Sequence, residues 1–409
     1  MAFYNQVATA TNDFTNNTKV KLVAGAVADE LDYIKASVSK MDQSEFKNKK
    51  YGRTYQLYLP DVGSVKEGIE ASPDDITEVP VDIKLNNFNT SCTIDAWNEL
   101  GDIESFTDQI AKPRAQHLAR QMGKSVIKDN VFKDMQFVKT ENAPTFGILS
   151  DASAALNELA VGGEIVSFMH PTVMGKIAAG GLANFIPGQD AKEIYGKNYL
   201  GQYAGAEQLN CSLLPTITTP ATASAPTATI SLTPVTDGVN TIGYEEVKQI
   251  SGTNLFAGAV FTVAGLKIVD QSGIETDQDA VIIVHSTNVA GTVGYISPLR
   301  ITVTGKNCGN PNAWVAAAGS LTLVYALEDS TTYFVGQVRT KDAFAFDSYK
   351  FGNLPGSENE DVSTVGNITV KMSTYGDGTN LSKLIRLDVP HAGGIWDARS
   401  AVLVLVKKA

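Results

Sequence analysis

One stretch of the chain, between Asp102 and Val138, shows a sustained helical alternation of apolar and polar positions. Apolar side chains recur there mostly at four- or eight-residue steps, which places them on one face of an α-helix. Pro113 interrupts the pattern because proline has no backbone N–H to donate, so we expect a kink or a separate short helix before it. The pattern therefore predicts one long helix. Its apolar positions are Phe106, Ile110, Leu118, Met122, Val126, Ile127, Val131 and Met135.

Strand-like alternation comes before this helix, at residues 54–60 (TYQLYLP) and 79–94 (VPVDIKLNNFNTSCTI). The segment between the two runs is acidic and contains glycine and proline. Two long strands joined by a polar segment predict an extended hairpin that packs poorly against its own domain. Two interpretations stay open, an ordinary β-hairpin with a long loop or an arm that reaches a neighbouring subunit. Residues 21–41 predict a moderately amphipathic helix.

The chain after the long helix alternates between helix and strand patterns. Residues 152–159 predict a helix, residues 164–169 a buried strand, and residues 208–215 another strand. The Thr/Ala/Pro-rich segment 216–234 predicts a linker or a surface strand.

Short β runs at roughly 8–12-residue spacing then extend from Ile242 to Tyr333, which is typical of a small barrel or sandwich. Long strands follow from Lys341 to the end of the chain. The pattern as a whole predicts an α+β protein with a separate β domain.

Composition limits the classes of function. A chain of 409 residues that is 43% hydrophobic can bury a sizeable core. Its net charge of −11 argues against a dedicated nucleic-acid-binding function, although not against enclosing nucleic acid. Cys92, Cys211 and Cys308 are distant from one another and suit a reducing compartment rather than a disulfide framework. The N-terminal residues do not resemble a signal peptide, and no apolar run has the length of a membrane span.

The sequence shows no recognisable catalytic or metal-binding motif. Gly123-Lys124-Ser125 resembles the end of a phosphate-binding loop, but Leu118 stands where the motif needs glycine. The acidic runs at 74–75 and 270–279 lack the ligand spacing of a calcium loop. We therefore expect no enzymatic activity, no cofactor and no metal. The histidines are isolated and are interpreted as surface or core residues, namely His117, His170, His285 and His391.

Three stretches carry a resemblance to a known family. They are FMHPTVMGKIAAGG…FIPGQDAKEIYGKN (168–198) with YAGAEQLNCSLLPTIT (203–218), NLFAGAVFTVAGLKIVDQSGIETDQDAVIIVHS (254–286), and DAFAFDSYKFGNLPGS (342–357). With the order of arm, hairpin, long helix and β block, they make the chain resemble the major capsid (coat) proteins of tailed bacteriophages that share the Hong Kong 97-type fold. The branch it resembles is that of short-tailed phages with an inserted β domain.

The resemblance implies an α+β fold divided into six regions. These are an N-terminal arm and helix (1–50), an extended loop hairpin (51–100), the spine helix of a peripheral domain (101–145), the first part of a central domain (146–215), an inserted β-barrel or sandwich domain (216–340), and strands that return to the central and peripheral domains (341–409).

The function implied is an icosahedral shell of hexamers and pentamers that encloses double-stranded DNA without sequence-specific binding. Such a protein assembles in the host cytoplasm with a scaffolding protein and a portal, belongs to the virion, and has no membrane partner.

Subunit contacts are expected at charged residues of the hairpin and the spine helix. Either the hairpin charges contact a neighbouring subunit or they only keep the loop solvated, while the basic residues of the helix face a neighbour or the interior of the shell. A surface or virion-decorating binding protein built on the β domain remains an alternative. The expected contact residues are Lys66, Glu67, Glu70, Asp74, Asp75, Arg114 and Arg120.

Overall fold

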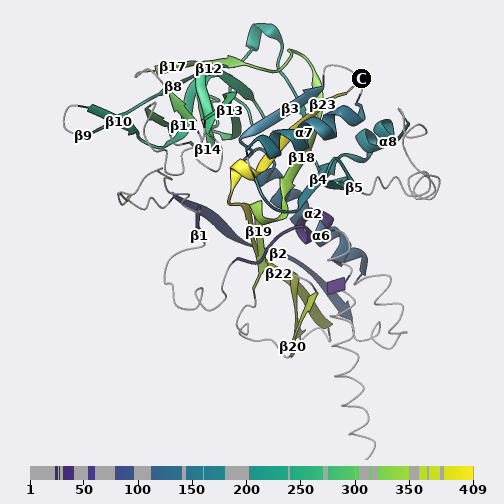
Figure 1. Ribbon diagram of the computed structural model, residues 1–409. Coiled ribbons are helices and arrows are strands. Elements are labelled where there is room, and N and C mark those ends of the chain that lie inside the picture. The colour runs from purple at the N-terminus through teal and green to yellow at the C-terminus, as the bar shows by residue number, and fades with distance from the viewer. Residues whose placement is uncertain are drawn as a thin grey trace, which may run out of the picture. The chain divides into compact units, whose positions relative to one another are not determined.

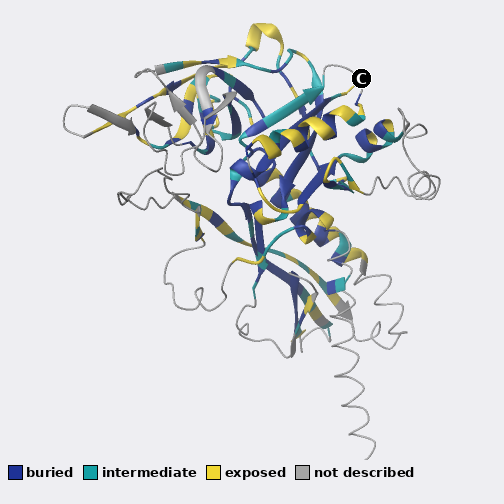
Figure 2. Ribbon diagram, viewed as in Figure 1, coloured by how far each residue is buried: buried dark blue, intermediate teal, exposed yellow. Residues whose placement is uncertain are grey.

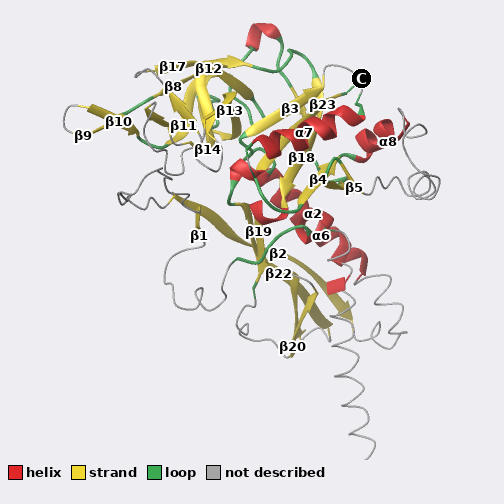
Figure 3. Ribbon diagram, in the orientation of Figure 1, coloured by secondary structure: helices red, strands yellow, loops and turns green. Residues whose placement is uncertain are grey.

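A computed structural model of the chain shows a mixed α+β protein built mostly of strands (Figure 3). Apart from residues 24, 25 and 27, the residues that the structure describes are 31–40, 54–59, 79–95, 112–140, 144–159, 161–179, 202–237, 240–269, 275–299, 301–303, 313–315, 320–349, 359–365, 368–377 and 382–408.

The chain divides into two compact units. The first comprises Met1–Gln56, Asp82–Val126 and Ala345–Gly394, and the second comprises Leu57–Val81, Ile127–Phe344 and Ile395–Ala409. Each unit contains segments that are distant in the sequence, because long-range strand pairing brings them together.

The first unit is organised around a six-stranded sheet with the path β1-β2-β22-β21-β20, and β19 pairs with β22 (Figure 1). The β2–β22 pairing is antiparallel and runs without interruption from Leu85–Ala392 to Asp95–Ser382. The two strands predicted for the hairpin are therefore confirmed, and the segment between them lies outside the described residues. The strands are β1 (Thr54–Leu59), β2 (Val79–Asp95), β19 (Phe344–Ser348), β20 (Asn359–Val365), β21 (Ile368–Asp377) and β22 (Ser382–Ile395).

Helix α6 (Lys112–Asn130) is shorter than the predicted long helix. The residues before Lys112 lie outside the described part of the chain, and Pro113 occupies the first turn, where a missing N–H costs no hydrogen bond. The predicted C-terminal end is wrong. After Asn130 the chain turns and Gln136–Thr140 forms strand β3, because its residues pair in parallel with strand β23 (Ala401–Lys407).

Of the helix predicted for residues 21–41, the structure describes residues 24, 25, 27 and 31–40, and the first three of these are helical. Helix α2 covers Asp32–Lys35, and the chain has left the helix by Val38, which forms a parallel bridge with Ala345. The predicted helix therefore extends too far at its C-terminal end.

The second unit contains a seven-stranded mixed sheet with the path β3-β23-β18-β4-β6-β5, and β7 pairs with β18. Its central strands are buried along almost their whole length (Figure 2), which explains why residues 401–406 form a continuous apolar run. The remaining strands are β4 (Ile165–Met169), β5 (Gln202–Tyr203), β6 (Ala206–Asn210), β7 (Thr216–Thr218) and β18 (Thr332–Thr340).

Two helices accompany this sheet, α7 (Phe146–Glu158) and α8 (Pro171–Ala179). Helix α7 begins six residues before the predicted helix 152–159, since Thr145 has extended backbone and Phe146 starts the first turn. The buried strand predicted at 164–169 is confirmed as β4. The strand predicted at 208–215 is β6, which begins and ends earlier than expected.

A ten-stranded sheet in the same unit closes on itself over part of its length. Strands β13, β14, β11, β8, β17 and β12 pair in that order, and β12 pairs back with β13, which makes a closed antiparallel barrel. The bounds of these strands are β8 (Thr227–Ser231), β11 (Val247–Thr253), β12 (Val260–Val269), β13 (Glu275–Thr287), β14 (Val293–Leu299) and β17 (Ser320–Tyr325).

The other four strands extend the sheet from the second half of β12. They are β9 (Pro234–Asp237), β10 (Asn240–Tyr244), β15 (Ile301–Val303) and β16 (Ala313–Val315).

Strand β8 comes from the Thr/Ala/Pro-rich segment that predicted a linker or a surface strand. It alternates strictly, with Ala228 and Ile230 inside the barrel and Thr227, Thr229 and Ser231 exposed. The strand interpretation is therefore correct for these residues and the linker interpretation is wrong.

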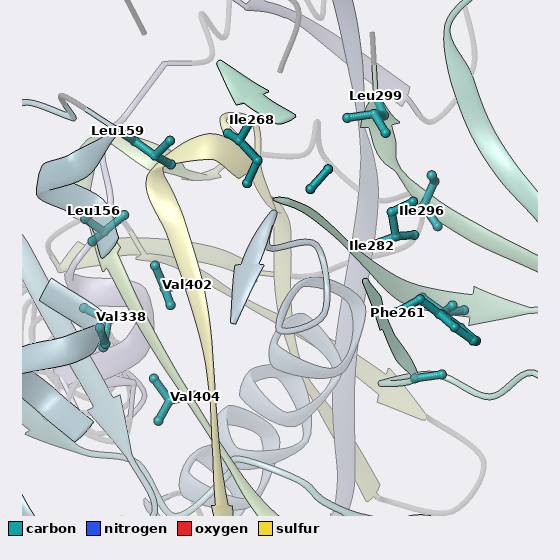
Figure 4. Close-up of a cluster of buried hydrophobic side chains, with 14 of the residues drawn as sticks. Leu156, Leu159, Phe261, Ile268, Ile282, Ile296, Leu299, Val338, Val402 and Val404 are labelled. Carbon is teal, nitrogen blue, oxygen red and sulfur yellow. The ribbon is translucent and has the colours of Figure 1, made fainter. Parts of the chain in front are cut away.

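One apolar core joins the barrel to the seven-stranded sheet. Leu156 of α7, Val402 of β23 and Ile282 of β13 belong to the same cluster of buried side chains (Figure 4). Two hydrogen bonds also link the barrel strands to the chain around β3. The Ser297 hydroxyl donates to the Lys133 carbonyl at 2.6 Å, and the Lys139 ammonium donates to the Ala326 carbonyl at 3.0 Å. The barrel therefore shares its core with the sheet.

A substitution at Gly258 tests how tightly the barrel and the sheet are packed together. A β-carbon at this position would lie 3.1 Å from the Phe132 ring and 3.2 Å from Ile217, and the residue has a φ of +93°. We expect Gly258→Ala to lower the free energy of unfolding by about 1–3 kcal/mol, because it combines backbone strain with overpacking. Urea denaturation followed by tryptophan fluorescence measures the change. Gly162→Ala is the control, since no heavy atom lies within 4 Å of its added carbon; equal effects of the two variants would contradict the interpretation.

Candidate functional site: an exposed basic helix face and buried charge networks

The exposed face of α6 is basic. Between Lys112 and Lys128 the sequence contains no acidic residue, although the whole chain has a net charge of −11. Arg114, Arg120 and Lys124 are exposed, as is Lys128 farther along the helix. At 3.6 residues per turn these four side chains fall within an arc of about 120°, so they share one face.

The opposite face of α6 is apolar and buried, which fixes the rotation of the helix. Leu118, Met122 and Val126 are each at most 4% exposed. This part of the predicted apolar stripe is confirmed, and Arg114 and Arg120 on the other side of the helix are exposed. Their role as subunit contacts stays a prediction.

The side chains on the exposed face supply mainly hydrogen-bond donors. Arg114 Nη1 donates a hydrogen bond to the Ser91 carbonyl of β2 at 2.5 Å, which holds the guanidinium group in place. His117 is exposed and lies 3.4 Å from the Gln121 amide nitrogen. Guanidinium and ammonium groups bind carboxylates and phosphates, so the face can bind an anionic partner.

The five hairpin residues expected to make subunit contacts lie outside the described residues. Their role as contacts therefore stays a prediction. They are Lys66, Glu67, Glu70, Asp74 and Asp75.

A buried carboxylate lies in the sheet of the first unit. Asp388 on β22 is 1% exposed and accepts hydrogen bonds from Arg386 Nε at 2.8 Å, Arg386 Nη2 at 2.9 Å and Asn87 Nδ2 at 2.8 Å. The carboxylate beside Arg386 raises the pKa of that guanidinium. This network connects β22 to β2, so it fixes the strand that leads into the hairpin.

His391 is buried on the same strand. Its ring stacks between Phe88 and Phe346 at centroid distances of 5.7 and 5.9 Å, and Nδ1 donates to the Val389 carbonyl at 3.0 Å. Burial lowers the pKa of the imidazole. The interpretation of His391 as a core histidine is therefore confirmed.

The second unit buries a charged network in its central sheet. The guanidinium of Arg339 on β18 lies between the rings of Phe168 and Phe344, at 5.0 and 4.5 Å from their centroids. Asp134, in the turn after α6, is 1% exposed and its Oδ1 accepts a hydrogen bond from Gln337 Nε2 at 2.7 Å. Burial raises the pKa of Asp134 well above its usual value, although the Gln337 hydrogen bond and the Arg339 charge oppose the shift.

A second buried pair precedes β23. Asp397 accepts hydrogen bonds from Arg399 Nε at 2.8 Å and from the Ser400 hydroxyl at 3.0 Å, and the adjacent Ala398 carbonyl accepts one from the Met135 amide. Both networks hold the chain between α6 and β3 against the central strands. The sequence contained no signal for these networks, because no pattern of charges around Asp134, Arg339 and Asp397 distinguishes buried from exposed positions.

Among the described residues, no group of three or more histidine, cysteine, aspartate or glutamate side chains could hold a metal ion. Cys92 and Cys211 are free thiols, and Cys308 lies outside the described residues. No helix in the described ranges is long and apolar enough to cross a membrane.

Comparison with known proteins finds likeness only among solved structures. No protein family and no curated protein matches the chain. A structure titled Mycobacterium phage Che8 matches with 12% identity and a TM-score of 0.43, over 91% of this chain and 90% of the other. The capsid of the cyanophage P-SCSP1u matches with 10% identity and a TM-score of 0.42, over 91% and 86% of the two chains. The capsid of an empty GTA particle matches with 10% identity and a TM-score of 0.42, over 95% and 90%. TM-scores below 0.5 at these identities do not establish the function of this chain.

The buried carboxyl group of Asp134 predicts a pH dependence of stability. Because its folded-state pKa is raised, the unfolded chain loses this proton first as the pH rises above about 4, and the folded state is then progressively destabilised. Asp134→Asn keeps the acceptor for Gln337 and removes the ionisation. We therefore expect the variant to gain stability relative to the original chain as the pH rises from about 4 to 7.

Urea denaturation at a series of pH values measures this difference. Asp151→Asn on the exposed face of α7 is the control, and its difference from the original chain should stay nearly constant. A constant difference for Asp134→Asn as well would contradict the burial argument.

Proposed function

We propose that this chain is the major capsid protein of a tailed phage and assembles by symmetric repetition into an icosahedral shell. The observation that carries the proposal is the order of the structural parts along the chain. A hairpin of two strands precedes α6, the seven-stranded sheet and the barrel follow, and β19–β23 return to both sheets. This is the order of parts on which the resemblance to the Hong Kong 97-type fold rests.

Within this proposal, each part has a structural role. The strands β1 and β2 lead into the extended loop (51–100), and α6 is the spine helix (101–145). The seven-stranded sheet belongs to the central domain (146–215 and 341–409), with β7 and β18 supplied by the two ends of the segment 216–340. The barrel is the inserted domain and lies within the same segment.

The size of β2 supports an arm. The strand is 17 residues long and its pairing with β22 begins only at Leu85, whereas typical strands have 5–6 residues. A strand of this length, held in the sheet by the Asp388 network, can support a loop that extends away from the sheet.

The ionisable residues support a structural role rather than an enzymatic one. Asp134, Asp388 and Asp397 each serve to hold a strand or a turn in place. The proposed partners are further copies of this chain in hexamers and pentamers, a scaffolding protein and a portal during assembly, and the enclosed double-stranded DNA. The proposed location is the virion.

A binding protein built on the β domain is less well supported. The barrel shares one apolar core with the seven-stranded sheet, so it is not a module attached through a linker. Gly258 also lies against side chains of that sheet and of the turn after α6.

Assembly is the first test of the proposed function. The purified full chain, expressed with and without a candidate scaffolding protein, should form closed shells or capsomers that negative-stain electron micrographs show directly. Monomers under every condition, measured by light scattering, would contradict the proposal.

The acidic hairpin loop gives a second test. We expect Asp74→Lys with Asp75→Lys to lower the yield of shells several-fold, because the reversed charges would remove the attraction of the loop to basic residues of a neighbouring subunit. Sedimentation measures the yield, and the circular dichroism of the unassembled chain should not change. Asp151→Lys with Glu158→Lys, on the exposed face of α7, reverses the same number of charges and is the control. Normal shell yield in the hairpin variant would show that its acids only keep the loop solvated.

A further inference from the structure

The basic face of α6 differs in charge from the rest of the chain. We propose that Arg114, Arg120 and Lys124 contact the phosphate backbone of the enclosed double-stranded DNA. The inference rests on the proposed function, because only a shell protein would present this face to packaged DNA.

The spacing of the three cations fits a linear polyanion. Arg114 and Lys124 are ten residues apart, which is about 15 Å along the helix axis. One strand of double-stranded DNA carries a phosphate about every 3.4 Å of helix axis, so this distance covers roughly four phosphates. Cations spread over this length, and over an arc of about 120° on one helix face, can therefore contact several phosphates of a duplex.

The chemistry of the face favours phosphate. The guanidinium groups of Arg114 and Arg120 can form paired hydrogen bonds with phosphate oxygens, and Lys124 adds a point charge. His117 and Gln121 lie among them and offer neutral polar contacts, and no carboxylate in residues 112–128 opposes an anion.

The acidic loop of a neighbouring copy is the competing partner for this face. That loop carries Lys66 next to Glu67, so its charge is mixed. A DNA strand carries only negative charge and therefore matches a helix face without acids better than a loop of mixed charge does. The net charge of −11 elsewhere repels DNA, which restricts contact to this face and keeps it weak.

The test measures how salt changes DNA binding by the unassembled full chain. Fluorescence anisotropy with a labelled 20-base-pair duplex of mixed sequence gives the affinity at a series of salt concentrations. Three phosphate contacts contribute about −2.7 to the slope of log affinity against log salt, which is a loss of about 40-fold between 50 and 200 mM salt. We expect the triple variant Arg114→Gln, Arg120→Gln, Lys124→Gln to lose this contribution.

The control removes three exposed lysines elsewhere, with Lys84→Gln, Lys176→Gln and Lys248→Gln. It should keep most of the slope. Equal slopes for the two triple variants, or no DNA binding by the original chain, would overturn the inference. Glutamine keeps the helix, and circular dichroism checks that both variants are folded.

Two further measurements separate this inference from the proposed function. Shells formed by an α6 variant with weakened DNA binding support both, whereas shells formed by the original chain together with an unchanged salt slope in the α6 variant contradict only the inference. An original chain that forms no shells contradicts the proposed function and, with it, the inference that rests on it. A synthetic peptide of residues 67–78 is the competitor. If it binds α6 more tightly than DNA does at equal salt, the face belongs to a neighbouring copy and the DNA contact is wrong.

Discussion

A single apolar core joins the barrel to the seven-stranded sheet, and the placement of the elements in the second unit depends on it. Side chains from α7, β18, β23 and the barrel strands fill one space, so no part of this core can be removed without leaving a cavity. Gly258 shows how tight the junction is, since a single added carbon would lie against Phe132 and Ile217. The barrel is thus folded together with the sheet, although the chain between them is rich in threonine and alanine.

Ionisable residues beside this apolar core are buried too, so they need partners within the protein. Arg339 and Asp134 are buried beside it, and each is stabilised by local partners, two aromatic rings for the guanidinium and the Gln337 amide for the carboxyl group. A buried charge tolerates few arrangements of its neighbours, which gives these residues a role in specifying one fold. In the first unit, the bonds from Arg386 and Asn87 to Asp388 do the same for the strand leading into the hairpin.

Much of this architecture was predictable from local patterns, and the exceptions have physical causes. The alternation of residues 79–94 identified β2, because the burial of that strand follows strand periodicity. The apolar run at 401–406 identified β23, because that strand is buried on both faces. The end of α6 was misplaced because Val131 and Met135 continue the helical spacing, although Val131 packs in a turn and Asp134 turns inward to Gln337. The pairings of β17 with β8 and β12 in the barrel and the hydrogen bond from Gln337 to Asp134 join residues distant in sequence, which periodicity does not reveal.

The net charge of the whole chain likewise gives an incomplete prediction of what its surface can bind. A value of −11 argues against nucleic-acid binding over the whole surface, yet the average conceals a segment of seventeen residues, 112–128, without one acid. Only the helical geometry of α6 and the burial of Leu118 and Met122 show that its cations share an exposed face. Long-range repulsion from an acidic surface and short-range attraction to a basic row act at different distances, because salt screens charges beyond about 8–10 Å. If the chain forms the proposed shell, such a face holds DNA at a few points and leaves the rest of it unbound.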